Sequence, residues 1–176
     1  MDETAMGEAA DERGDFADRR AKYLTFSLGE EEYGIPILKV KEIIGMMPFT
    51  PVPQMPPCFK GVVNLRGKVI PVIDLRVRLG LPPEEYTERT CIIVAEVPEE
   101  EGIATMGMVV DSVSEVLNIG EEDIEAPPRM GAQARADYIR GMAKAGGEVK
   151  ILLDANRIVG LLQWSASKER GESEPL

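Results

Sequence analysis

Apolar and polar residues alternate where the foldable part of the chain begins. Leu24, Phe26 and Leu28 fall on one side of the pattern, and Thr25 and Ser27 fall on the other. A period of two places neighbouring side chains on opposite faces of a β-strand. The alternation resumes after a Gly-Glu-Glu turn, so this segment predicts a β-hairpin.

The apolar spacing then lengthens to three and four residues. Ile37, Val40, Ile43 and Ile44 form one stripe that ends at Gly45. This spacing fits a short helix or a twisted strand, and periodicity alone does not separate the two. The stripe is either part of the core or a row of anchors for a partner.

Further strands follow a proline-rich connection, MMPFTPVPQMPP, in which the missing amide donors disfavour a central strand. The runs GVVNLR and KVIPVIDL meet near Gly67, and residues 80–89 predict a linker. The runs TCIIVAEV, IATMGMVVDSV and SEVLNI add strands at the short spacing of small barrels.

The second half of the chain repeats the first, at an offset of 73 residues and further on of 80. The longer offset implies about seven extra residues in the second copy, between positions 117 and 140. We interpret the repeat as the duplication of one small β unit. The aligned pairs are Gly34/Gly107, Val40/Val113, Glu42/Glu115, Ile43/Val116, Ile44/Leu117, Lys60/Arg140, Gly61/Gly141, Gly67/Gly147, Val69/Val149, Asp74/Asp154 and Gly80/Gly160.

Charge and hydropathy exclude some classes of partner. The chain has 31 acidic and 20 basic residues, a formal charge of -11, which disfavours nucleic acid because phosphate binding needs an excess of Lys and Arg. No apolar run approaches the ~20 residues that span a bilayer, and the start has no leader-like pattern. We therefore expect a cytoplasmic protein without direct membrane insertion.

Catalytic signals are weak. The chain has no histidine and no motif for binding phosphate or metal, so we expect no enzyme activity, cofactor or metal. Cys58 and Cys91 are isolated and predict buried thiols. Acidic pairs such as Glu84-Glu85 predict solvated turns, and Asp74 and Asp154 predict helix N-caps. A small enzyme with a carboxylate pair between barrels stays as the remote alternative.

Two segments carry a family resemblance. FKGVVNLRGKVIPVIDLR and GMVVDSVSEVL, together with Glu42, resemble the CheW-like domain family from Tyr23 to about Leu162. The resemblance implies a mostly β fold with two five-stranded SH3-like barrel subdomains and short helices around a shared core. It also implies an adaptor that couples chemoreceptors to the histidine kinase CheA in bacterial chemotaxis. A coupler for pili or second-messenger output is the alternative.

The resemblance implies one CheW-like domain over residues 22–162. Its two barrel subdomains are expected to be intertwined, the first over roughly 30–80 and the second over roughly 90–160, with the chain ends packing across. The first 20 residues hold seven acids, three arginines and few large apolar residues, so 1–21 predict a disordered acidic tail. Residues 163–176 are expected to form a C-terminal tail.

The resemblance also implies sites by position. A receptor's helical hairpin is expected in a groove between the barrels, and Glu42 and Arg66 are expected to form an ion pair that holds its wall. CheA's regulatory domain is expected near the β-hairpin at Gly61 and at a second loop, where this sequence lacks the family's basic and aromatic residues. The groove residues are Leu24, Ile37, Val40, Ile43 and Val113, and the kinase-facing residues are Gly61, Asn64, Leu65, Glu125 and Met130.

Overall fold

Strands dominate the computed structural model, which describes residues 20–99, 102–126 and 138–158. Its short helical elements are η2 (Ile37–Lys39), α2 (Leu75–Arg78), η3 (Glu121–Asp123) and a turn over 155–158. Within these residues, no helix has the length and apolar character to cross a bilayer. The strands are β1 (Arg20–Leu28), β2 (Glu31–Pro36), β3 (Val40–Gly45), β4 (Phe59–Leu65), β5 (Lys68–Asp74), β6 (Cys91–Glu99), β7 (Gly102–Val110), β8 (Ser112–Gly120), β9 (Ile124–Glu125), β10 (Ile139–Ala145) and β11 (Glu148–Leu153).

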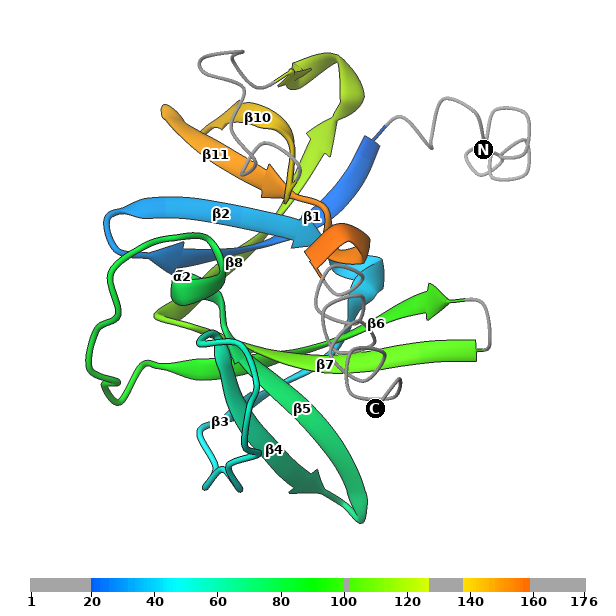
Figure 1. Cartoon of the computed structure of the whole chain (residues 1–176). Coiled ribbons are helices and arrows are strands. Elements are labelled where there is room, and N and C mark those ends of the chain that lie inside the picture. The colour runs from blue at the N-terminus through cyan, green and yellow to red at the C-terminus, as the bar shows by residue number, and fades with distance from the viewer. Residues whose placement is uncertain (1–19, 100–101, 127–137, 159–176) are drawn as a thin grey trace, which may run out of the picture.

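The strands form two sheets that lie one above the other in Figure 1. The six-stranded sheet has the order β8-β1-β2-β11-β10-β9, and the five-stranded sheet has the order β3-β6-β7-β5-β4. The predicted mostly β fold with two β subdomains and short helices is confirmed. The β1–β2 hairpin pairs with the later strands and the β6–β7 hairpin pairs with the earlier ones, so each sheet combines strands from both of the expected ranges, 30–80 and 90–160.

The sequence repeat relates the two sheets. β5 pairs in parallel with β7, with Val72 opposite Gly107, and β11 pairs in parallel with β2, with Leu152 opposite Gly34. The repeat relates these two pairs, because Val72 aligns with Leu152 at the offset of 80 and Gly34 aligns with Gly107 at the offset of 73. The first copy supplies β1–β2 to the centre of the six-stranded sheet and β4–β5 to the edge of the five-stranded sheet. The second copy supplies the equivalent hairpins, β6–β7 and β10–β11, to the opposite sheets, which supports the duplication.

The apolar stripe that begins at Ile37 is a helical turn followed by a bulged strand. η2 covers Ile37, and β3 pairs with β6 with a shift in register between Val40 and Glu42. The extra residue, Lys41, turns Val40 and Ile43 toward the same face although they are three positions apart. The β-bulge thus explains why a strand has the three-residue apolar spacing of a helix.

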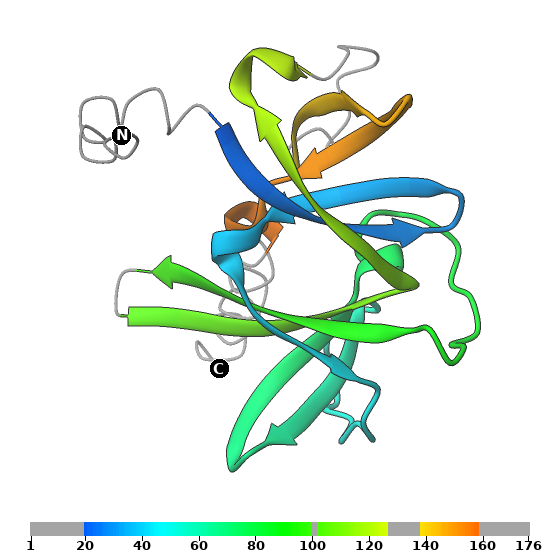
Figure 2. The same ribbon diagram turned by 180° about the vertical axis from the view of Figure 1, so that it is seen from behind.

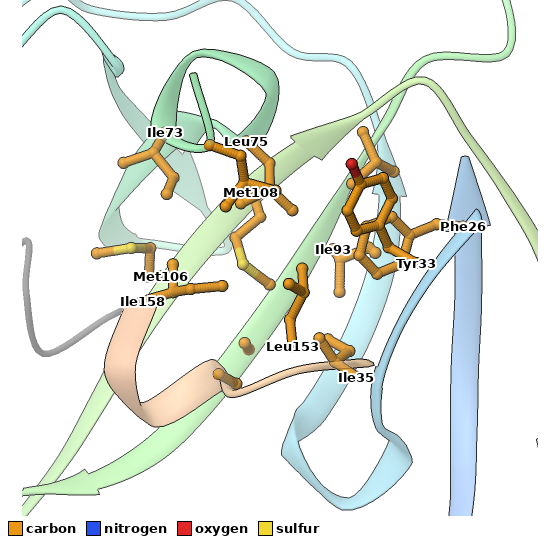
Figure 3. Close-up of a cluster of buried hydrophobic side chains, with 14 of the residues drawn as sticks. Phe26, Tyr33, Ile35, Ile73, Leu75, Ile93, Met106, Met108, Leu153 and Ile158 are labelled. Atoms are coloured by element: carbon orange, nitrogen blue, oxygen red, sulfur yellow. The ribbon is translucent and has the colours of Figure 1, made fainter. Parts of the chain in front are cut away.

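The largest apolar core lies between the two sheets (Figure 3). Burial of one large aliphatic side chain stabilises a fold by about 1.5–3 kcal/mol, so side chains from both sheets hold the two together. The core includes Phe26, Tyr33, Ile35 and Leu153 from the six-stranded sheet, Ile73, Ile93, Met106 and Met108 from the five-stranded sheet, and Leu75 and Ile158 from helical turns.

An ion pair joins α2 to the turn between β7 and β8. Arg76 donates from Nε to Oδ1 of Asp111 at 3.0 Å and from Nη2 to Oδ2 at 2.9 Å. Its Nη1 donates to the Pro82 carbonyl at 2.7 Å, and Asp111 also accepts from the Gly29 amide at 2.7 Å. These hydrogen bonds connect α2 to the linker, to the turn between β1 and β2 and to the turn between β7 and β8.

Asp74 caps α2 as predicted, because its Oδ1 accepts from the Arg76 amide at 3.0 Å. Its other oxygen accepts from the Tyr86 hydroxyl at 2.9 Å, so the linker is attached to the same residue. In the second copy Asp154 accepts from the Arg157 amide at 3.2 Å. Both predicted N-caps are confirmed.

Gly61→Ala is expected to destabilise the fold by about 2–3 kcal/mol. Gly61 has a φ of 142°, and a Cβ there would lie 2.5 Å from the Thr50 carbonyl oxygen, which itself accepts from the Val62 amide. Urea unfolding measures the loss. Gly45→Ala is the matched control because a Cβ at Gly45 meets nothing within 4 Å. Equal stability of the two variants would contradict the close approach.

Candidate inter-sheet binding surface

Two edge strands, β8 from one sheet and β3 from the other, lie on the same side of the molecule (Figure 2). Ile43 on β3 lies opposite Ile93, and Val116 on β8 lies opposite Leu24. Cross-strand partners share a face, so both exposed residues border the core between the sheets. We call this set the inter-sheet surface: Ile37, Val40, Ile43, Val113 and Val116.

The two sides of this surface are built alike. The register between β8 and β1 shifts so that Val113 and Val116 both face the shared core, as Val40 and Ile43 do on β3. Val40 and Val113 are half-buried against that core, whereas Ile43 and Val116 are 43% and 49% exposed. The surface thus has a buried base and an exposed apolar rim on each side.

Leu24 does not belong to this surface, which corrects the predicted set. Its side chain is 3% exposed and packs in the shared core beside Val116. Alternation on β1 placed Leu24 on the correct face, but β1 lies inside the sheet and that face is buried in the core, whereas Val116 lies on the edge strand β8. Sequence reasoning missed Val116, although the repeat pairs Val116 with Ile43 and could have identified it.

The predicted contact between Glu42 and Arg66 is present. Arg66 lies in the turn between β4 and β5 and donates from Nη2 to Oε2 of Glu42 on β3. Arg66 has a φ of 53°, a left-handed conformation that costs a residue other than glycine about 1–2 kcal/mol. The second copy has Gly146 at this position, with a φ of 65°. The turn alone would favour glycine, so the arginine serves the contact.

The predicted kinase-facing residues of the first copy have structural roles in the hairpin. Gly61 is buried and has no side chain to offer, and Asn64 accepts from the Gly67 amide at 2.8 Å. Leu65 packs against a second apolar cluster. The exposed apolar side chain of this hairpin is Val69, at 65%, which sequence reasoning did not select.

The second predicted kinase-facing loop is described only in part. Glu125 lies on β9 opposite Met142 of β10 and is exposed. It borders a hollow of about 250 Å³ that Lys144 and Val149 also line. Met130 lies outside the described residues.

Comparison with known proteins assigns the chain to a family. A family model described as the CheW-like domain matches residues 22–163. The chain belongs to the CheW-like domain family. It is 39% identical to "Chemotaxis protein CheW" of Klebsiella aerogenes over 78% of this chain and 81% of that protein. It is 35% identical to "Probable chemotaxis protein CheW" of Rhizobium etli over 86% and 89%.

A solved structure agrees with this assignment. The crystal structure of the scaffolding protein TtCheW from Thermoanaerobacter tengcongensis aligns with a TM-score of 0.68 and 35% identity, over 76% of this chain and 88% of that one. The predicted resemblance is confirmed, and with it the class of function: a CheW-type adaptor of chemotaxis signalling.

The two thiols of this CheW-like domain are not activated. Burial raises the pKa of both Cys58 and Cys91, so both are protonated near neutral pH. Among the residues that the structure describes, no group of three or more His, Cys, Asp and Glu side chains is placed to hold a metal ion. The features that stand out on this CheW-like domain are surfaces for binding.

Arg66→Gly is expected to change the free energy of unfolding of this CheW-like domain by less than about 1 kcal/mol. Relief of the left-handed conformation offsets the loss of an exposed ion pair. Arg66→Ala loses the pair but keeps the backbone strain, so it should be the less stable variant. Urea unfolding of the three proteins tests this order. A loss above 2 kcal/mol in Arg66→Gly would mean that the pair contributes more than exposed pairs do.

Proposed function

We propose that this CheW-like domain couples chemoreceptors to the histidine kinase CheA by holding both at once. The inter-sheet surface carries the proposal, because it presents apolar side chains from two sheets around one core. Apolar rows of this kind bind amphipathic helices, whose apolar stripe fills the space between them. The receptor partner is the helical hairpin at the cytoplasmic tip of a methyl-accepting chemotaxis receptor.

The receptor contact uses both edges of the surface. Ile37, Val40 and Ile43 form one side, and Val113 forms the other together with Val116, which we add to the set. The exposed side chains of Ile43 and Val116 support this assignment, since removing apolar surface from water by binding a partner is favourable. Leu24 supports the contact only through the core.

The kinase contact is placed on the β4–β5 hairpin. Its tip exposes Val69 beside Lys68 and near Arg66, which is paired with Glu42, so the tip offers an apolar side chain next to a basic one. Gly61 and Asn64 shape this hairpin, and Leu65 anchors it. We include Glu125 and Met130 as a second kinase-facing region in extended arrays.

The ion pair connects the two proposed contacts. Glu42 lies on β3, which carries the receptor-facing Ile43, and Arg66 lies at the tip of the kinase-facing hairpin. A shift in one element is therefore transmitted to the other through a charged contact. The adaptor acts by fixing the geometry of receptor and kinase, in the cytoplasm at membrane-associated receptor arrays.

A bridging assay tests the proposal. An immobilised receptor signalling fragment is incubated with the CheA regulatory domain, with and without the adaptor. We expect the kinase domain to be retained only when the adaptor is present. Retention of neither partner would contradict the assignment for this receptor and kinase, and the assay would be repeated with the components of another chemosensory pathway.

A further inference from the structure

A hollow of about 570 Å³ lies beside Val113, next to the inter-sheet surface. Residues from both sheets and from the linker between them border it. Because Val113 belongs to both features, a helix on the inter-sheet surface passes the mouth of the hollow. Its lining residues are Ser27, Arg89, Cys91, Ser112, Val113 and Ser114.

Arg89 gives this hollow an uncompensated positive charge. Its side chain is exposed and forms no ion pair within the part of the chain that the structure describes. The carboxylate of Glu32 accepts from the hydroxyls of Ser27 at 2.6 Å and Ser114 at 3.1 Å, and it lies 3.8 Å from the ammonium group of Lys150. The nearby carboxylate of Glu32 therefore already has partners of its own. A basic side chain without an ion pair among the described residues stands out in a chain whose formal charge is -11.

The repeat shows how the opposite side of the surface differs. It pairs Ser112 with Lys39, and Lys39 borders a second hollow of about 270 Å³. Leu38 and Ile103, both exposed apolar residues, line that second hollow together with Glu96. Glu96 is paired with Lys41, whose ammonium lies 3.4 Å from its carboxylate, but it still lines this second hollow, so a carboxylate from a partner would meet an acid there as well as the ammonium of Lys39.

We propose that the hollow beside Val113 receives an acidic side chain of the chemoreceptor hairpin and that Arg89 binds its carboxylate. The inference rests on the proposed receptor contact. A guanidinium suits this role because it is always charged and binds a carboxylate through two parallel hydrogen bonds. Val113 and Cys91 contact the methylene groups of the acid, and the Ser112 hydroxyl offers another donor. The nearly symmetric apolar sides would accept a two-helix partner in either of two orientations, and Arg89 selects one.

Receptor-fragment binding by Arg89→Glu and by a matched control tests the assignment. Lys144→Glu makes the same change in net charge on β10, which lies four strands away from β8 in the same sheet. We expect Arg89→Glu to weaken binding by about 10-fold or more, since hydrogen bonds to charged groups contribute that much. Lys144→Glu should stay within about 2-fold, and far-UV circular dichroism should be unchanged in both.

Cys91 offers a second readout in the wild-type protein. Alkylation of its half-buried thiol by N-ethylmaleimide is followed by mass spectrometry, with and without the receptor fragment. We expect the fragment to slow alkylation of Cys91, and the buried Cys58 to stay unreactive in both samples.

The outcomes separate this inference from the proposed function. If the fragment binds wild type and Arg89→Glu equally and Cys91 is not protected, the receptor contact stands but the hollow is not part of it. If the fragment protects Cys91 while Arg89→Glu binds normally, the hollow is covered but does not recognise an acid. If the fragment does not bind the wild type, both assignments are wrong.

Discussion

Val116→Asp is expected to reduce receptor-fragment binding by about 30-fold or more, because an apolar side chain that a partner covers contributes about 2 kcal/mol and the new charge would be desolvated. The side chain is 49% exposed in the free protein, so the substitution adds no buried charge before the partner binds. Isothermal titration with the receptor signalling fragment measures the loss. Retention of the CheA regulatory domain should be unchanged.

Val149→Asp is the control for this experiment. Val149 is also 49% exposed and also lies on a strand, but β11 is separated from β8 by two strands of the same sheet. The two variants have the same chemistry and the same starting exposure. If both weaken receptor binding equally, the inter-sheet surface is not the receptor contact and a general charge effect explains the loss.

Arg76→Ala is expected to lower the free energy of unfolding by about 3 kcal/mol, the low end of the range for breaking a buried ion pair. The Arg76 side chain is 10% exposed, whereas that of Asp111 is 34% exposed, so water recovers part of the loss. Urea unfolding measures the change, and Arg157→Ala on the exposed side of the last turn should alter stability by less than about 0.5 kcal/mol. A loss below about 1 kcal/mol would show that the pair contributes no more to stability than a solvent-exposed ion pair does.

The same pair gives the protein a pH dependence. Burial by itself raises the pKa of Asp111, but hydrogen bonds from Arg76 and from the Gly29 amide, together with the charge of Arg76, hold the pKa below its ordinary value. A carboxyl group whose pKa is lower in the folded state contributes stability above about pH 4, the unfolded value, and loses it as pH falls through the folded value. Asp111→Asn should therefore show a flatter loss of stability at acid pH than wild type.

Local patterns in the sequence predicted most of the elements. Alternation identified β1 and β2, glycine and proline marked the turns, and Asp74 and Asp154 indicated the starts of helical turns. The exchange of hairpins between copies could not be predicted this way. Which hairpin pairs with which strand depends on contacts such as Thr25 with Glu115, 90 positions apart, and no local preference encodes them.

The sequence predicted those parts of the candidate site that follow from the spacing of apolar residues. It did not predict which of these residues are buried by the rest of the fold. The stripe from Ile37 to Ile43 reads directly from spacing, and Val110, Val113 and Val116 repeat that spacing in the second copy, so the repeat was sufficient to identify Val116. Leu24 and Val116 show the limit clearly, because they lie opposite each other on paired strands. Only the arrangement of the sheet decides which of the two reaches the surface.

The exchange of hairpins between the copies also governs how the protein is made. β1 leaves the ribosome early, yet its partner β8 begins about 90 residues later, and β2 waits longer still for β11. The early hairpin must therefore persist with two unpaired edges while the rest is synthesised, since long-range pairing forms slowly. Assembly of this fold is therefore completed only after β11 has been synthesised, and until then the edges of the early hairpin stay open to pairing with other strands.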